Sequence, residues 1–166
     1  HPNNVDAVRN YTEDYEYDLL GNIKVMKHRF QTQAGVGGGW TRHYRYAFDD
    51  VPGNRTNRLT STSQPGDPNA GPYTGTYAYD AYGNMTRMPH LAAMDWNFMD
   101  QLRRVDLGGG GTAYYVYGLG GQRLRKVIER NGNLKLEWIF LGAVMIHRRR
   151  RRNTNDLRLE RWTVHI

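Results

Sequence analysis

The chain carries a repeated eight-residue pattern, Tyr-x-Tyr-Asp-x-x-Gly-Asn, and this repeat limits its fold more than any other feature. The pattern occupies residues 15–22 and again residues 77–84, and a degraded copy without the Asp occupies residues 115–122. Looser relatives begin at Tyr44 and Trp96. The spacing is irregular, but a recurring short unit predicts an array of similar elements that are stable only when packed together.

Each position of the pattern has a physical role in a β-hairpin. Two aromatic residues at i and i+2 point to the same face of a strand. Asp accepts hydrogen bonds from backbone N–H groups two residues on, which starts a turn, and Gly supplies the positive φ that follows. The pattern therefore predicts hairpins that offer aromatic pairs to their neighbours. The residues assigned to these structural roles are Tyr15, Tyr17, Asp18, Gly21, Asn22, Tyr77, Tyr79, Asp80, Gly83, Asn84, Tyr115, Tyr117 and Gly121.

The β signal continues between the repeats. Residues 126–130 and 133–140 are rich in β-forming side chains and are joined by Asn131-Gly132, the preferred two-residue hairpin turn. We therefore predict an all-β fold, an array of antiparallel hairpins that forms one curved sheet and a single domain over residues 1–166. Glycine-rich loops are predicted near residues 35–39, 66–72 and 108–111.

Residues 90–105 are open to two interpretations. Leu91, Met94, Phe98, Leu102 and Val105 recur at helical spacing, which predicts an amphipathic helix. The alternation of Trp96 and Phe98 indicates a strand instead. We favour the strand, because the segment lies between two repeat units.

The positive charge is concentrated in one short segment. Without the five arginines Arg148, Arg149, Arg150, Arg151 and Arg152, the net charge falls from +7 to +2. Residues 147–152 contain no Phe, Tyr or Trp, so stacking with nucleic-acid bases is not indicated. We expect a solvated loop or edge here, with a patch for phosphate or another anion as the alternative.

These motifs resemble those of RHS/YD-repeat proteins. Residues 73–130, which include the second and third repeats, are similar to the C-type component of insecticidal toxin complexes, and residues 157–166 resemble a strand of the same protein. The resemblance implies a hollow β-shell that, with a B-type partner, encloses a toxic C-terminal polypeptide until delivery. It also implies a secreted protein of bacterial origin.

The resemblance covers only the wall of such a shell. In that family a later segment closes the shell and cleaves the toxin free with paired aspartates, and this chain ends before that segment would begin. We therefore expect a piece of a longer protein that carries neither the protease nor the toxin. Its expected partners are neighbouring repeats, a B-type shell component and the enclosed polypeptide.

No residue pattern predicts catalysis, a metal or a cofactor. The two serines, Ser61 and Ser63, have no nucleophile-elbow glycines around them, and no cysteine is present. The histidines show no metal-ligand spacing, and Asp18 and Asp80 are interpreted as turn formers rather than as a carboxylate pair. No apolar run approaches the roughly 20 residues that cross a bilayer.

Two other functions remain open from the sequence. Exposed Tyr and Trp faces suit sugar rings, so a carbohydrate-binding YD-repeat module outside the cell is the main alternative. A basic module that binds anionic polymers through the arginine run is the other. An isolated hairpin array has open sheet edges, so self-association is expected in either case.

Overall fold

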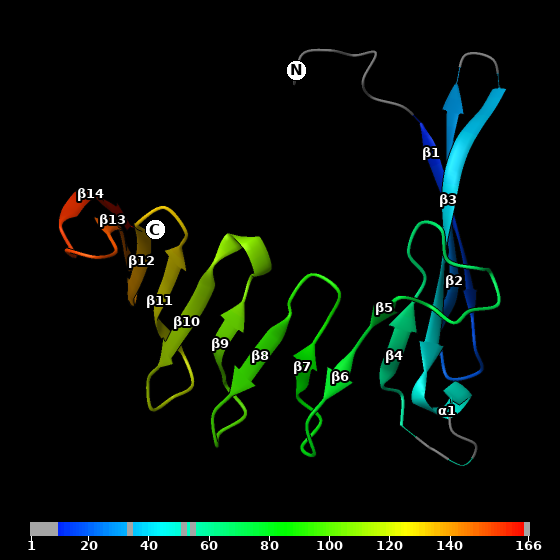
Figure 1. Ribbon diagram of the computed structural model, residues 1–166, viewed down its shortest axis with the longest axis horizontal. Helices are drawn as coiled ribbons and strands as arrows, with labels where there is room; N and C mark the ends of the chain where they lie inside the picture. The colour runs from blue at the N-terminus through cyan, green and yellow to red at the C-terminus, as the bar shows by residue number, and fades with distance from the viewer. Residues whose placement is uncertain (1–9, 33–34, 51–52, 54–55, 165–166) are drawn as a thin grey trace. The chain divides into compact units, whose positions relative to one another are not determined.

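The computed structural model describes residues 10–32, 35–50, 53 and 56–164, and most of them lie in strands (Figure 1). All strand pairs among these residues are antiparallel, so the predicted all-β fold is confirmed. The strands are β1 (Tyr11–Tyr17), β2 (Ile23–Thr32), β3 (Gly35–Tyr46), β4 (Leu59–Thr62), β5 (Gly75–Thr76), β6 (Ala78–Tyr79), β7 (Met85–Arg87), β8 (Ala93–Trp96), β9 (Leu102–Asp106), β10 (Thr112–Tyr117), β11 (Arg123–Arg130), β12 (Leu134–Leu141), β13 (Val144–Arg151) and β14 (Leu157–Val164). A helix, α1 (Ala47–Asp50), follows β3, and a 3-10 turn covers Gly108–Gly110.

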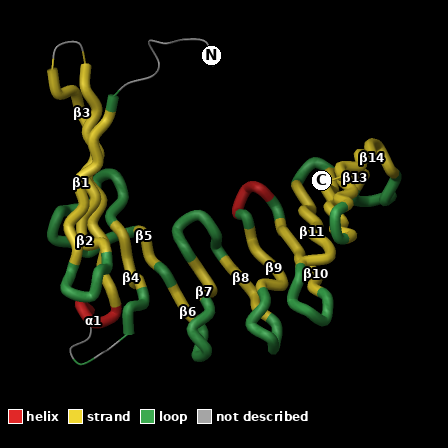
Figure 2. The backbone as a smooth tube through the Cα atoms, turned by 180° about the vertical axis from the view of Figure 1, so that it is seen from behind, coloured by secondary structure: helices red, strands yellow, loops and turns green. Residues whose placement is uncertain are grey.

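The chain divides into two compact units, His1–Tyr77 and Ala78–Ile166. The described strands form three sheets where the repeats predicted one. The first unit holds a five-stranded sheet in the order β1-β2-β3-β4-β5, and the second holds the pair β6-β7 and a seven-stranded sheet from β8 to β14. Within each sheet every strand pairs with the next one along the chain, as an array of hairpins requires (Figure 2).

The segment predicted as a glycine-rich loop at residues 35–39 is instead the beginning of β3. Gly39 pairs with Arg29 and Gly37 with Phe30, with a bulge between the two pairs. A Cβ atom at Gly39 would lie 2.2 Å from the carbonyl oxygen of His28, so the backbones come together only because this residue is glycine. Residues 66–72 lie in turns and bends, and residues 108–111 contain the 3-10 turn.

The buried residues of the second unit belong to the strands of its larger sheet. Met94, Val105, Ala113 and Ile128, from β8 to β11, form one apolar cluster, and partly buried side chains such as Leu136 and Trp138 pack against it. Met94 lies opposite Val105, and Val105 opposite Ala113, so the cluster is a row of cross-strand neighbours on one face of the sheet.

Residues 90–105 form strands rather than a helix. Strand β8 ends at Trp96, a turn follows, and β9 begins at Leu102. The helical spacing of apolar residues arises because two short strands each bury alternate side chains, Met94 in β8 and Val105 in β9. The turn between them contributes Phe98, which is 95% exposed and belongs to no buried face.

The arginine run is a strand inside the sheet, which corrects the expected solvated loop or edge. Strand β13 includes Arg148 to Arg151 and lies between β12 and β14, paired with both (Figure 1). Like charges in sequence are separated here because successive strand residues point to opposite faces. Only Arg152 lies beyond the strand, in the turn that leads to β14.

Candidate functional site

The two full copies of the repeat fold into the same hydrogen-bonded turn. In the first, the Asp18 N–H donates to the carbonyl oxygen of Asn22 at 2.9 Å, and Gly21 N–H donates to the carbonyl oxygen of Asp18 at 3.1 Å. The Asp18 carboxylate accepts from the backbone N–H groups of Leu20 and Asn22, both at 2.8 Å, and from the Asn22 side chain at 2.8 Å. The second copy repeats each of these bonds.

In that second copy Asp80 takes the place of Asp18. The Asp80 carboxylate accepts from the N–H groups of Tyr82 at 3.0 Å and Asn84 at 2.8 Å, and from the Asn84 side chain at 3.1 Å. Gly83 has a φ of 97°, which a residue with a Cβ atom rarely adopts. The Asp, Gly and Asn positions of the repeat therefore close the turn, and the two residues between Asp and Gly take no side-chain part in it.

Two further turns keep the backbone geometry with other side chains. At the turn after β8, Asn97 replaces Asp, and its Oδ1 accepts from the N–H groups of Met99 at 2.9 Å and Gln101 at 3.0 Å. Its amide donates to the Gln101 side chain at 2.9 Å. At the turn after β10, Gly118 has no side chain, yet its N–H still donates to the carbonyl oxygen of Gln122 at 2.9 Å.

Each of these four turns follows a β-bulge at the second aromatic position. The register shifts just before Tyr17, Tyr79, Trp96 and Tyr117. Trp96 is thus the second aromatic of its unit and not the first, with Met94 in the leading place. The relative that begins at Tyr44 has no such turn, because α1 follows it directly.

The turn aspartates are poor candidates for acid–base chemistry. Burial raises the pKa of Asp80, but the hydrogen bonds from the Asn84 side chain and from the Asn84 and Tyr82 backbone together lower that pKa below its ordinary value. The pKa of Asp18 is lowered by the same balance, with Asn22 and Leu20 as donors. A carboxylate held ionised by local donors serves as a hydrogen-bond acceptor.

The six tyrosines of the repeat units make different contacts. Rings of Tyr15 and Tyr17 stack with their centroids 6.2 Å apart in the first unit. The hydroxyl of Tyr77 lies 3.3 Å from that of Thr62, and Tyr79 belongs to β6. On β10, Tyr115 lies beneath Arg123 and Lys126, while the Tyr117 hydroxyl donates to the carbonyl oxygen of Leu102 at 3.0 Å. The tyrosines bind mainly their own hairpins and nearest neighbours.

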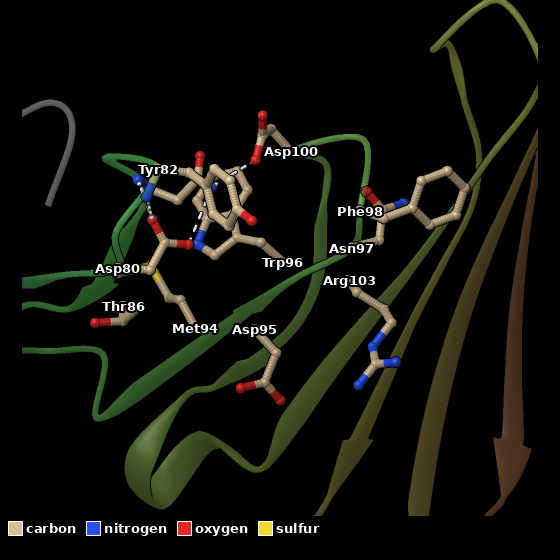
Figure 3. Close-up of a pocket in the computed structure, with 11 residues that line it drawn as sticks. Asp80, Tyr82, Thr86, Met94, Asp95, Trp96, Asn97, Phe98, Asp100 and Arg103 are labelled. Atoms are coloured by element: carbon tan, nitrogen blue, oxygen red, sulfur yellow. Dashed lines mark hydrogen bonds between the residues drawn. The ribbon is translucent and has the colours of Figure 1, made fainter.

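A hollow of about 760 Å³ lies beside two successive turns of the second unit (Figure 3). Asn84 joins the two turns, since its amide also donates to Asp100 at 2.7 Å. The indole N–H of Trp96 donates to the carbonyl oxygen of Met85 at 2.8 Å, which fixes the ring. Figure 3 shows Phe98 well apart from Asp80 and Tyr82, so the aromatic side chains do not make one flat platform. The residues that line the hollow are Asp80, Tyr82, Asn84, Thr86, Met94, Asp95, Trp96, Asn97, Phe98, Asp100 and Arg103.

The sequence analysis did not predict this hollow. The turn after β8 could have been predicted, because Asn97, Asp100 and Gln101 occupy the positions of Asp, Gly and Asn in the repeat. Asp100 even takes the positive φ of the glycine, at 54°. Among the residues that the structure describes, no group of three His, Asp or Glu side chains is placed to hold a metal ion.

The arginine run splits into two sets by strand alternation. Arg148 Nε donates to Glu160 at 2.6 Å, and Arg150 lies 3.4 Å from Glu137. Arg152, beyond the strand, lies 3.3 Å from Glu129. The remaining two, Arg149 and Arg151, are exposed, and neither has an acidic partner within ion-pair distance among the described residues. The run is therefore not one uniform row of unpaired cations, because its even-numbered members already lie beside glutamates.

Glu137 is the acidic centre of this region. It is only 4% exposed and binds Arg125 at 2.6 Å on one side and Arg150 on the other. Burial alone would raise the pKa of Glu137, but the two guanidinium groups lower it by more, so the pKa lies below its ordinary value.

No described helix has the length and apolar character needed to cross a bilayer.

Comparison with known proteins shows similarity at the level of structure. The sequence matches no protein-family model and no curated protein. The solved structures that match over 94% of the chain include the crystal structure of TcdB2-TccC3-TEV, with a TM-score of 0.69 and 20% identity. They also include the Tc holotoxin pore of Photorhabdus luminescens, with 0.68 and 20%, and the crystal structure of TcdB2-TccC3-Cdc42, with 0.65 and 21%.

The chain spans 7% of the length of each of these three solved chains. At this level of identity the similarity shows the fold: the described hairpin array has the architecture of part of these toxin-complex structures. The resemblance drawn from the repeat motifs is therefore confirmed for the fold.

Proposed function

We propose that this chain is a wall segment of a larger RHS-repeat shell, which encloses a toxic polypeptide until delivery and to which this segment contributes no catalysis. The fold similarity over 94% of the chain to structures of TcdB2-TccC3 complexes carries the proposal. The partners are neighbouring repeats, a B-type shell component and the enclosed polypeptide. The source is a bacterium that secretes the assembled toxin.

The open edges of the sheets support this role. Among the described strands, β1 pairs only with β2, and β14 pairs only with β13. Large apolar side chains on β14 are exposed, including Trp162 at 63% and Val164 at 62%. A strand whose outer edge is unpaired and that carries such side chains can pair with another strand, and in a longer repeat array that strand belongs to the next hairpin.

Self-association of the purified chain tests the proposal. We expect the wild-type chain to form oligomers in light scattering, because its edges pair with other copies. The double variant Leu157→Lys/Val164→Lys places a charge at each end of β14 and should shift the chain to monomers. The control is Leu19→Lys, because Leu19 is fully exposed in a turn and belongs to no edge. It should behave like the wild type.

The result that would contradict the wall segment is a wild-type chain that stays monomeric at high concentration with a stable β-rich fold. A Leu19→Lys variant that also becomes monomeric would show that solubility, and not the edge, governs association. Circular dichroism of each variant confirms that the fold is kept.

The hollow beside Asp80 supports a second function, carbohydrate binding. Tyr82 is 86% exposed there, and Asp95, Asn97 and Asp100 line the same hollow with hydrogen-bonding groups. An aromatic face with nearby carboxylate and amide groups suits a sugar ring. A glycan array tests this function: a reproducible ligand lost in Tyr82→Ala supports it, and no ligand at all leaves the shell wall as the function.

A further inference from the structure

The two faces of strands β11 to β14 differ sharply in charge. All three glutamates of these described strands lie on one face. Arg148 lies opposite both Glu137 and Glu160, and Glu129 lies two residues from Val127, which is opposite Glu137. On the other face the register places His147 opposite Trp138 and Arg161, and Arg149 opposite Leu136 and Leu159. We name this second surface the basic face. Its cationic side chains are Lys126, Arg130, Arg149, Arg151 and Arg161.

Apolar and basic side chains form neighbouring stripes on the basic face. Strand β12 contributes Leu134, Leu136 and Trp138, which are half-buried, and β13 contributes Arg151, Arg149 and His147 directly opposite them. One of these cross-strand pairs is in direct contact, because the rings of Trp138 and His147 stack with centroids 4.9 Å apart. A ligand for this surface must therefore offer negative charge and apolar contact side by side.

The ring of Trp138 is not free to stack on a nucleic-acid base. Lys126 lies 5.3 Å from its centroid, and His147 stacks on it. Single-stranded nucleic acids depend on exposed aromatic platforms as well as on positive charge. A polypeptide with acidic and aliphatic side chains provides both contacts that the stripes require, and no aromatic platform is needed.

We infer that the basic face binds an acidic polypeptide segment whose aliphatic side chains cover Leu134 and Leu136 while its carboxylates meet Arg149 and Arg151. Charge complementarity carries the inference, because these two arginines are exposed and have no acidic partner among the described residues. The inference goes beyond the proposed function and does not depend on it, since it concerns one face of the sheet and not its edges.

The test measures binding of a fluorescent peptide of Glu-Leu-Glu-Gly repeats to the full chain by anisotropy. We expect saturable binding that weakens as salt is raised, and a loss of about tenfold in affinity for Arg149→Glu, because a charge pair at the interface becomes a repulsion. The matched control is Lys135→Glu, which makes the same charge change on the opposite face of β12 and should stay within about twofold of wild type. If Arg149→Glu fails to fold by circular dichroism, Arg149→Gln serves in its place.

Three outcomes would overturn the inference. The first is no binding of the peptide to the wild-type chain. The second is an equal loss in Lys135→Glu and Arg149→Glu, which would mean attraction by total charge alone. The third is equal or better competition by a single-stranded oligonucleotide or by a leucine-free polyglutamate of the same charge. None of these measurements reports on edge pairing, so failure here leaves the shell-wall proposal to its own test.

Discussion

At the scale of single residues, the repeat works through complementary donors and acceptors at its first and last turn positions. Asp80 offers two carboxylate oxygens to the Asn84 amide and to backbone N–H groups. Asn97 and Gln101 reverse the side-chain direction, since the Asn97 amide donates to Gln101. Where side chains close the turn, as they do at Asp80 and Asn97, they therefore form a matched donor–acceptor pair, and no particular residue is needed.

The reversed side-chain hydrogen bond at Asn97 predicts how substitutions affect the Asp80 turn. Asp80→Asn places an amide against the amide of Asn84 and should lower the free energy of unfolding. The double variant Asp80→Asn/Asn84→Gln reproduces the Asn–Gln pair seen at residues 97 and 101 and should recover part of that loss. Urea unfolding of both variants measures the difference, and a double variant no more stable than the single one would contradict the matched-pair account.

The same carboxylates make the chain sensitive to acid. The pKa values of Asp18 and Asp80 are lowered in the folded chain, so their contribution to stability is fully present above the unfolded pKa of about 3.9. It is lost as the pH falls through the lower folded values. We expect the melting temperature to fall below about pH 4 and to fall less in Asp80→Asn. Equal acid sensitivity in that variant and the wild type would show that other carboxylates dominate.

At the scale of elements, local chemistry could be predicted and distant partners could not. The turns at Asp18 and Asp80 are formed by consecutive residues, so the repeat pattern predicts them. The loop or edge predicted for the arginine run is wrong because Glu137 and Glu160, which pair with Arg150 and Arg148, come from neighbouring strands. Residues 35–39 were misjudged for a related reason: the tight approach of Gly39 to β2 overrides the ordinary preference of glycine for loops.

Glu137 tests how much β13 depends on these distant partners. The carboxylate is almost fully buried between Arg125 and Arg150. Glu137→Gln removes the charge and keeps the shape, and it should lower the free energy of unfolding by about 1–3 kcal/mol, because Arg150 is left without its buried partner. Chemical denaturation measures the loss. The comparison variant is Glu16→Gln, at an exposed ion pair with Lys27, where a much smaller loss than in Glu137→Gln is expected.

At the scale of the whole molecule, each unit has its own sheets and its own interior. The apolar cluster of Met94, Val105, Ala113 and Ile128 lies wholly within residues 78–166. The sequence repeat predicted neither the boundary at Tyr77 nor the division into three sheets. The boundary cuts through a repeat motif, since Tyr77 belongs to the first unit and Tyr79 to the second, and the pattern of the repeat is continuous there.

This division predicts that the second unit folds alone. A chain that begins at Ala78 retains the apolar cluster and both of its sheets, so it should show a β-type circular dichroism spectrum and a cooperative thermal transition. Val105→Ala in that shorter chain should lower the transition, since the Val105 side chain is 2% exposed. A shorter chain without a cooperative transition would mean that the first unit is required for folding.

The bonding scheme of the turn has a practical consequence for protein engineering. Closure uses the Asp, Gly and Asn positions, and the two positions between Asp and Gly point outward: Leu19 is 105% exposed and Tyr82 is 86% exposed. Those two sites in each turn are therefore attachment points at which a fluorophore, an epitope or a crosslinker can be placed without rebuilding the scaffold. Because the turns share one bonding scheme, labels attached at the same position of successive turns would report where each turn lies along the array.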